Sequence, residues 1–164
     1  MQTPSMFVKS HDVQPLHVLG TEVRFLCEAH STNSVWSLME VTLPQDAGPP
    51  AHAHRWDEAY FITEGDVEFT VGEQRFMATA GDFVYTPGSV VHGFRGASPR
   101  PARVLIFDAP AHAGAFFRRV DREVKELPRD LPKVLEIGED SGIHFVRAAQ
   151  AVSDDRVAAC VQPD

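Results

Sequence analysis

Residues 52–58 read His-Ala-His-Arg-Trp-Asp-Glu, and a further histidine, His92, closes the run Pro-Gly-Ser-Val-Val-His of residues 87–92. His52 and His54 are two residues apart, so they point to the same face of an extended segment, and Glu58 keeps that parity. Three imidazoles and one carboxylate suit a divalent transition metal ion. The interval between Glu58 and His92 is long enough for a meander of strands to return His92 to the other three.

Short alternating segments, separated by glycine or proline, run from about residue 16 to about residue 108. Gly20 and Gly72 mark hairpin turns. In the third segment Val35, Met39 and Leu43 share one parity and are expected to be buried. Such evenly spaced short strands predict an all-β sandwich or barrel. The expected strands are residues 16–19, 23–27, 35–43, 52–63, 67–71, 75–78, 82–86, 90–95 and 103–107.

The chain after Pro110 carries helical patterns instead of strand patterns. A short helix is expected at residues 113–120, and a second helix starts at Leu131 after the capping residue Asp130 and ends near Gly142. Residues 143–146 suit a further short strand. The face of the second helix expected to be buried comprises Leu131, Val134, Leu135 and Gly138.

One domain spanning residues 1–164 accounts for these patterns, since no repeat or second core is visible. It divides into a barrel core at about residues 16–108, a helical cover at about 111–148 and a tail at 149–164. The fold class is therefore all-β with short C-terminal helices.

Composition and net charge argue against some classes of binding partner and some cellular locations. The chain of 164 residues has a net charge of −8 and no basic run, which disfavours nucleic acid as a partner. No apolar run is long enough to span a membrane, and the N-terminus lacks a signal-peptide pattern. Cys27 and Cys160 are far apart and are interpreted as reduced thiols. We therefore expect a cytoplasmic protein without a membrane or nucleic-acid partner.

The two histidine motifs together resemble those of the cupin superfamily, which read G-x5-H-x-H-x3-4-E-x6-G and G-x5-P-x-G-x2-H-x3-N. The resemblance covers about residues 35–108 and implies a double-stranded β-helix, a jelly-roll-like barrel with the metal inside one mouth. The residues of this chain that match the motifs are His52, His54, Glu58, Gly65, Gly81, Pro87 and His92.

Three positions depart from the family motifs without removing a metal ligand. Gly48 stands closer to His52 than the leading glycine of the first motif does. Gly88 precedes the glycine position of the second motif, which Ser89 occupies, and Gly96 stands in place of the terminal asparagine. These departures concern the local loop geometry.

The resemblance and the donor set imply one divalent transition metal ion per chain, held by His52, His54, Glu58 and His92. Four protein ligands leave one or two exchangeable positions on an octahedral ion, as a catalytic metal requires. The donor set does not choose among Fe, Ni, Mn, Cu, Co and Zn.

An apolar, aromatic wall is expected around this site, which favours a hydrophobic and planar small-molecule ligand. Asp57 should point away from the metal, Arg55 and Trp56 are placed at the exposed mouth, and His112 is a candidate to support a ligand. The Phe116–Phe117 pair is expected to pack the helix onto the barrel. The residues predicted to line the substrate pocket are Tyr60, Ile62, Phe69, Phe94 and Phe107.

The Phe-Phe-Arg run at residues 116–118 and the Leu-Pro-Lys-Val-Leu run at residues 131–135 extend the likeness. With one barrel, they resemble the quercetin-dioxygenase-like monocupins. That resemblance implies cleavage of an enol or hydroxylated aromatic compound by dioxygen, with Glu58 as both metal ligand and catalytic base. It also implies a homodimer, for which we expect the outer strands near the N-terminus to form the interface.

Two other classes of function stay open at this point. One is a non-catalytic cupin that binds a small molecule or a metal without turnover, because a fold does not fix a function. The other is a metal-dependent isomerase or hydrolase, whose polar substrate would call for Arg and Lys in the site. The strand positions here are mostly apolar, which favours the oxidoreductase.

Overall fold

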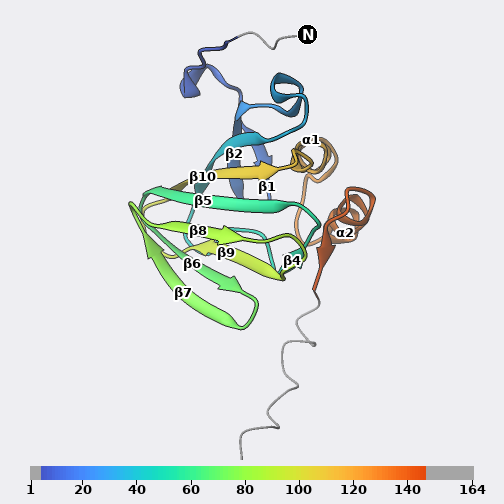
Figure 1. Cartoon of the computed structure of the whole chain (residues 1–164). Coiled ribbons are helices and arrows are strands. Elements are labelled where there is room, and N and C mark those ends of the chain that lie inside the picture. Colours follow the sequence, from blue (N-terminus) through green and yellow to red (C-terminus); the bar gives the residue numbers. More distant parts are fainter. Residues whose placement is uncertain (1–4, 147–164) are drawn as a thin grey trace, which may run out of the picture.

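Two antiparallel sheets face each other to form a barrel, and two helices cover it on one side (Figure 1). This computed structural model describes residues 5–146, so the tail expected at 149–164 lies outside the described residues. The double-stranded β-helix predicted from the sequence is confirmed. In spatial order, the six-stranded sheet contains β1 (Leu16–Val18), β2 (Thr21–Cys27), β3 (Ser37–Leu43), β10 (Ala102–Ala109), β5 (Asp57–Glu64) and β8 (Phe83–Thr86).

The second sheet has five strands and carries the C-terminal end of the described chain at its edge. Its spatial order is β11 (His144–Phe145), β4 (His52–Ala53), β9 (His92–Gly96), β6 (Asp66–Val71) and β7 (Gln74–Thr79). Two short 3-10 helices, η1 (Ser10–Asp12) and η2 (Ala29–Thr32), precede β3. The predicted hairpins at Gly20 and Gly72 are confirmed as the β1–β2 and β6–β7 pairs.

Strict alternation along β2, β3 and β10 builds the core of the barrel. Each fully buried large side chain there contributes about 1.5–3 kcal/mol of hydrophobic stabilisation. Val35 does not join this core, contrary to expectation, and is 63% exposed. The reason is that Asn33 and Ser34 adopt positive φ angles, so the chain turns before β3 begins at Ser37.

The segment predicted as one strand at residues 52–63 is interrupted in the structure. β4 pairs with β9 in one sheet, whereas β5 pairs with β10 and β8 in the other. Residues 54–56 therefore cross from sheet to sheet and leave the ladder. Every second residue nevertheless stays buried through this segment, as predicted: residues 52, 54, 56, 58 and 60 are all buried.

Helix α1 (Ala113–Glu123) begins where a buried carboxylate receives its first N–H groups. Asp108, at the end of β10, accepts hydrogen bonds from the N–H of His112 at 2.9 Å and of Ala113 at 3.0 Å. Such bonds satisfy the unpaired donors of a helix N-terminus. The helix buries Phe116 and Val120 and so packs against the barrel, as predicted.

Helix α2 (Leu131–Asp140) buries only part of the face predicted. Leu131 and Leu135 are 46% and 42% exposed, whereas Val134, Ile137 and Gly138 are buried. Gly138, which was predicted on the buried face, packs onto β11. A Cβ atom at this glycine would lie 2.7 Å from Cε2 of Phe145, so the missing side chain permits the contact.

The predictions that the cysteines are reduced and that no segment spans a membrane can be compared with the structure only within residues 5–146. In this range Cys27 is a buried free thiol, and Cys160 lies outside it. None of the helices in the described range has the length and apolar character needed to cross a bilayer.

Asp130 stands at the N-cap position of α2, as predicted, but its side chain does not cap this helix. Oδ2 instead accepts the N–H groups of Lys125 and Glu126, and Oδ1 lies 3.1 Å from Nζ of Lys133. The N–H of Lys125, the Lys133 ammonium and the N–H of Glu126 hold the pKa of Asp130 well below its usual value. The ionised carboxylate thereby fixes the turn between the two helices.

We expect this carboxylate to make the stability of the cover dependent on pH. Its pKa is lower in the folded chain than the value of about 3.9 in an unfolded chain, so its contribution is present above about pH 4 and lost as the pH falls further. The midpoint of thermal unfolding of Asp130→Asn should therefore lie below that of the wild type at pH 7, with the gap narrowing on acidification. The exposed Glu136→Gln change in α2 serves as control, and an equal gap for both variants contradicts the assignment.

Candidate metal centre

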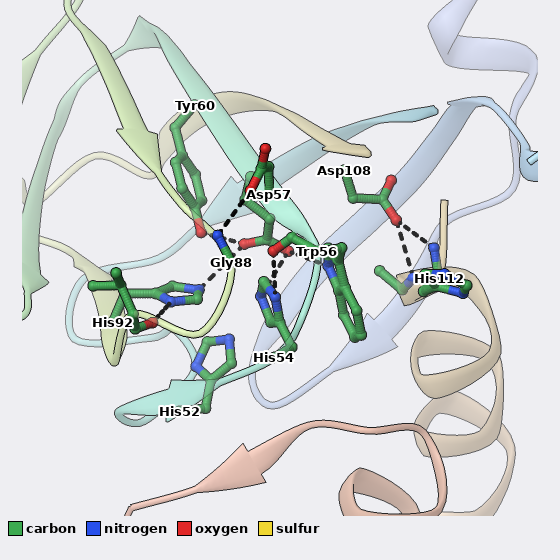
Figure 2. Close-up of polar contacts among 12 residues, drawn as sticks. His52, His54, Trp56, Asp57, Tyr60, Gly88, His92, Asp108 and His112 are labelled. Carbon is green, nitrogen blue, oxygen red and sulfur yellow. Dashed lines mark hydrogen bonds and ion pairs between the residues drawn. The ribbon is translucent and has the colours of Figure 1, made fainter. Parts of the chain in front are cut away.

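The structure brings His52, His54, Glu58 and His92 together at one mouth of the barrel (Figure 2). One ligand atom from each lies within 4.8 Å of the others, and all four residues are buried. His52 on β4 stands directly opposite His92 on β9. His54 lies on the crossing segment and Glu58 on β5, so the two sheets each contribute to the group.

Each histidine of the group is oriented by a backbone carbonyl. Nδ1 of His52 lies 2.9 Å from the carbonyl oxygen of Pro50, that of His54 3.0 Å from Trp56 O, and that of His92 2.9 Å from Val90 O. A carbonyl only accepts hydrogen bonds, so Nδ1 carries the proton in all three rings. Nε2 is then a free lone pair, the form that binds a metal ion.

Two of these Nε2 atoms are buried without a hydrogen-bond partner, namely those of His54 and His92. They lie 3.4 Å from Oε1 and Oε2 of Glu58, respectively. Leaving buried acceptors unsatisfied costs free energy, and lone pairs that point at a carboxylate repel it. A divalent cation between them would remove both costs, so the residues present fit a metal ion.

The protonation states support this reading. Burial raises the pKa of the Glu58 carboxyl, and a positive charge at Nε2 of His54 and His92, from a proton or a metal ion, holds it well below its usual value. Burial and the nearby His92 lower the pKa of His52 to about 4. Burial and the Glu58 charge raise the pKa of Tyr60 well above its usual value. The carboxylate is therefore ionised, His52 is neutral and the Tyr60 phenol keeps its proton.

Two aromatic residues hold the Glu58 carboxylate. Tyr60 donates its hydroxyl proton to Oε2, and the indole Nε1 of Trp56 donates to Oε1 at 3.4 Å. Trp56 is only 5% exposed, so its predicted place at the open mouth is wrong. The signal was available, because Trp56 has the same even parity as His54 and Glu58.

The loop of residues 87–91 braces the ligands from behind. The N–H of Ser89 donates to His54 O at 2.6 Å, and the N–H of Gly88 donates to Oδ1 of Asp57 at 2.8 Å. Asp57 thus points away from the metal group, as predicted. A Cβ atom on Gly88 would lie 2.3 Å from the carbonyl oxygen of Arg55, which explains why glycine occurs one position early. Ser89 takes the positive φ of 70° instead.

We expect Gly88→Ala to push this loop away from the crossing segment. Overpacking of this kind costs about 1–3 kcal/mol of folding free energy, and the displaced loop should weaken metal binding. Ser89→Ala is the matched control, because it leaves the backbone contacts of the loop intact. Denaturant unfolding and metal titration of both variants provide the measurement. Equal metal affinities would show that the loop does not brace the ligands.

An apolar cavity of about 50 Å³ opens beside the metal group. The hydroxyl of Thr21 in its wall donates to Val18 O at 2.6 Å, so it is already satisfied. The polar groups left to meet a ligand are those of His52, His54 and Glu58. The other lining residues are Val18, Leu19, Met39, Val41, Pro49, Trp56, Phe94, Ile106, Ala113, Phe116, Phe117, Ile143 and Phe145.

The residues predicted for the pocket divide into three groups. Phe94 lines the cavity, and Tyr60 stands behind Glu58. Ile62 and Phe69 are fully buried in the core, outside the cavity wall. Phe107 is 41% exposed on the outer face of the six-stranded sheet, so its assignment to the pocket is corrected.

Ile106 takes the inward position on β10 instead of Phe107, because side chains alternate along a strand. His112 is not among the four clustered residues and lies behind Trp56, with ring centroids 5.7 Å apart. Phe116 and Phe117 pack α1 onto the barrel as expected and also line the cavity. Sequence reasoning missed Ile143 and Phe145, since nothing in their short strand signals an approach to the metal group.

Comparison with known proteins finds a family model that matches the central part of this chain. Residues 39–108 match the cupin domain model. This segment is similar to the cupin domain and makes up less than half of the chain. It carries all four residues of the metal group, and the strands β3 to β10 that position them. Among curated protein sequences, none matches this chain.

Solved structures share the fold at low sequence identity. A predicted oxalate decarboxylase from Thermotoga maritima is 19% identical, with a TM-score of 0.59 over 63% of this chain and 98% of that one. The polyketide cyclase RemF from Streptomyces resistomycificus is 18% identical, with a TM-score of 0.58 over 65% and 80%. An RmlC-like cupin from Shewanella frigidimarina is 22% identical, with a TM-score of 0.56 over 68% and 96%. These likenesses show the cupin fold alone.

We expect the wild-type protein to bind one divalent metal ion per chain and His92→Ala to lose this stoichiometric binding. Metal at a hundredfold excess over its Kd should stabilise the folded wild type by about 2.7 kcal/mol, and the variant by far less. His30→Ala is the control, because this histidine is exposed outside the site. Elemental analysis and unfolding with and without metal provide the test. Full occupancy in His92→Ala contradicts the ligand assignment.

Proposed function

We propose that this protein is a metal-dependent oxidoreductase of the dioxygenase type that acts on a small enol or hydroxylated aromatic compound. The observation that carries the proposal is the cavity wall. Its side chains are apolar except for the metal group and the already satisfied Thr21 hydroxyl. A ligand with an apolar body and one ligating oxygen matches this distribution.

The absence of cationic side chains from this wall argues against a strongly charged substrate. Among the described residues that line the cavity there is no arginine or lysine. A dicarboxylate or a sugar phosphate would bring two or more negative charges next to Glu58 and lose its hydration without a partner. A single enolate or phenolate oxygen is compatible, because three neutral imidazoles and one carboxylate leave a net charge of +1 on a divalent ion.

His52, His54, Glu58 and His92 would hold the metal, which when bound would supply Lewis acidity and, if redox-active, electron transfer to dioxygen. A carboxylate oxygen of Glu58 accepts the proton of the substrate hydroxyl. The Trp56 and Tyr60 donors keep the carboxylate in place while it does so. The surrounding apolar side chains exclude water from the reacting oxygen.

The size of the cavity adds a constraint on entry. A volume of about 50 Å³ accommodates a few water molecules and not an aromatic ring. A ring-sized substrate therefore enters by displacing side chains of the cover. Phe116 and Phe117 on α1 and Phe145 on β11 are the large side chains that stand in its way.

A homodimer is part of the same proposal, although its surface differs from the N-terminal strands expected from the sequence. Exposed aromatic side chains gather on the outer face of the six-stranded sheet. Phe61 on β5 is in register with Phe83 on β8, and Ala59 is in register with both Phe107 and Tyr85. Phe61, Phe83, Tyr85 and Phe107 are each at least 41% exposed. Such an apolar face suits a second copy of the chain.

We expect the metal-loaded protein to consume dioxygen when it is given a flavonol or a simpler enol. Glu58→Gln should retain metal and lose turnover by roughly 10²–10⁴-fold, because the amide cannot accept the proton. Oxygen uptake, product analysis and metal content are measured on the same samples. Glu22→Gln, remote from the cavity, is the control.

The outcomes separate the competing functions. Full turnover by metal-loaded Glu58→Gln refutes the role of this carboxylate as base. Substrate that binds to the metal-loaded protein without oxygen uptake favours a non-catalytic or isomerase-type cupin. A protein that binds no divalent metal overturns the proposal as a whole.

A further inference from the structure

Trp56 makes three separate contacts with the metal group (Figure 2). Its indole ring stacks on the His54 imidazole with a centroid distance of 4.0 Å and an angle of 4° between the planes. Its Nε1 donates to Oε1 of Glu58 at 3.4 Å, and its carbonyl oxygen accepts from Nδ1 of His54 at 3.0 Å. One residue therefore contacts two of the four ligands.

We propose that Trp56 is a positioning residue that fixes His54 and Glu58 relative to each other for metal binding. The inference rests on the metal-binding half of the proposed function and not on the reaction with dioxygen. Supporting groups of this kind set the orientation of metal ligands, and their removal costs about 10–100-fold in metal affinity.

The two side-chain contacts restrict different motions. The stacked indole covers one face of the His54 ring and hinders its rotation, so Nε2 stays aimed at the other ligands. The indole N–H is a donor without a lone pair. It can therefore hold a carboxylate oxygen of Glu58 but cannot itself bind the metal. The carbonyl contact belongs to the backbone and persists in any side-chain variant.

Trp56 is itself held firmly in place. It is 5% exposed, and His112, the residue before α1, lies on it with ring centroids 5.7 Å apart. The N–H of His112 binds the buried Asp108 carboxylate at 2.9 Å. The indole is thus wedged between the metal group and the start of the cover, which leaves it little freedom to leave the His54 ring.

Trp36 provides a matched control for every measurement. It is the other tryptophan of the chain and is 38% exposed. Its ring lies on the outer surface beside Phe107, with the two ring centroids 6.1 Å apart. Trp36→Phe removes an indole without touching the metal group. The same substitution at position 56 keeps one aromatic ring and removes the N–H donor together with part of the indole surface.

The first test is metal titration in the absence of substrate. Trp56→Phe should bind Zn²⁺ about 10-fold more weakly than the wild type, and Trp56→Leu, which loses ring and donor, about 100-fold more weakly. Trp36→Phe should bind as the wild type does. If Trp56 only fills the core, the unfolding midpoint of the metal-free variants falls while their metal affinity stays unchanged, and this result overturns the proposal.

The second test uses the native Trp56 and does not depend on how its variants fold. In Trp36→Phe the fluorescence comes from Trp56 alone, so Co²⁺ or Ni²⁺ bound beside the stacked indole should quench it, with saturation at one equivalent. In Trp56→Phe the remaining Trp36 should respond weakly. Stoichiometric metal binding without quenching in Trp36→Phe overturns the proposal, and a wild type that binds no metal overturns it together with the proposed function. A protein that binds metal but takes up no oxygen leaves the proposal for Trp56 intact.

Discussion

The structure of the site depends on three hydrogen bonds from imidazole Nδ1 atoms to backbone carbonyls. Each bond uses the one N–H of a neutral ring, and the opposite Nε2 lone pair is thereby turned toward the barrel interior. Two of these lone pairs are buried beside an ionised carboxylate with no hydrogen-bond partner. An arrangement that supplies no donor to these two Nε2 atoms is costly in a metal-free protein and is satisfied by a cation.

The convergence of the ligands follows from the crossing of one segment between two sheets. A single continuous strand would spread His52, His54 and Glu58 along one face, with about 20 Å from the first to the last. Because β4 and β5 belong to different sheets, residues 54–56 bend the chain and bring the three side chains to one point. The N–H of Ser89 donates to the carbonyl of His54 and the N–H of Gly88 donates to Asp57, which ties the second histidine motif to the first.

Period-2 alternation and glycine placement predicted a sandwich or barrel and its hairpins, whereas the four clustered residues and the double-stranded β-helix were predicted from the histidine motifs and their resemblance to those of cupins. They could not show where the ladder breaks, since parity continues through residues 54–56 without interruption. Trp56 was misplaced for the same reason, because the exposed mouth was assumed where the chain in fact turns inward. Phe107 was chosen for its aromatic character, whereas alternation on β10 selects Ile106. On α2 the helical periodicity placed Val134 and Gly138 correctly, but it did not show that Ile137 is buried in place of Leu131 and Leu135.

The ligands and the cavity wall have different origins in the chain, and this division bears on function. All four clustered residues lie within residues 39–108, the segment that matches the cupin domain model. Much of the aromatic wall comes instead from α1 and β11, which follow that domain. The domain match can therefore indicate a metal group, whereas under the proposed function Phe116, Phe117 and Phe145 would select an apolar substrate over a charged one. Cupin domains with the same four donors and a different cover would be expected to act on different molecules.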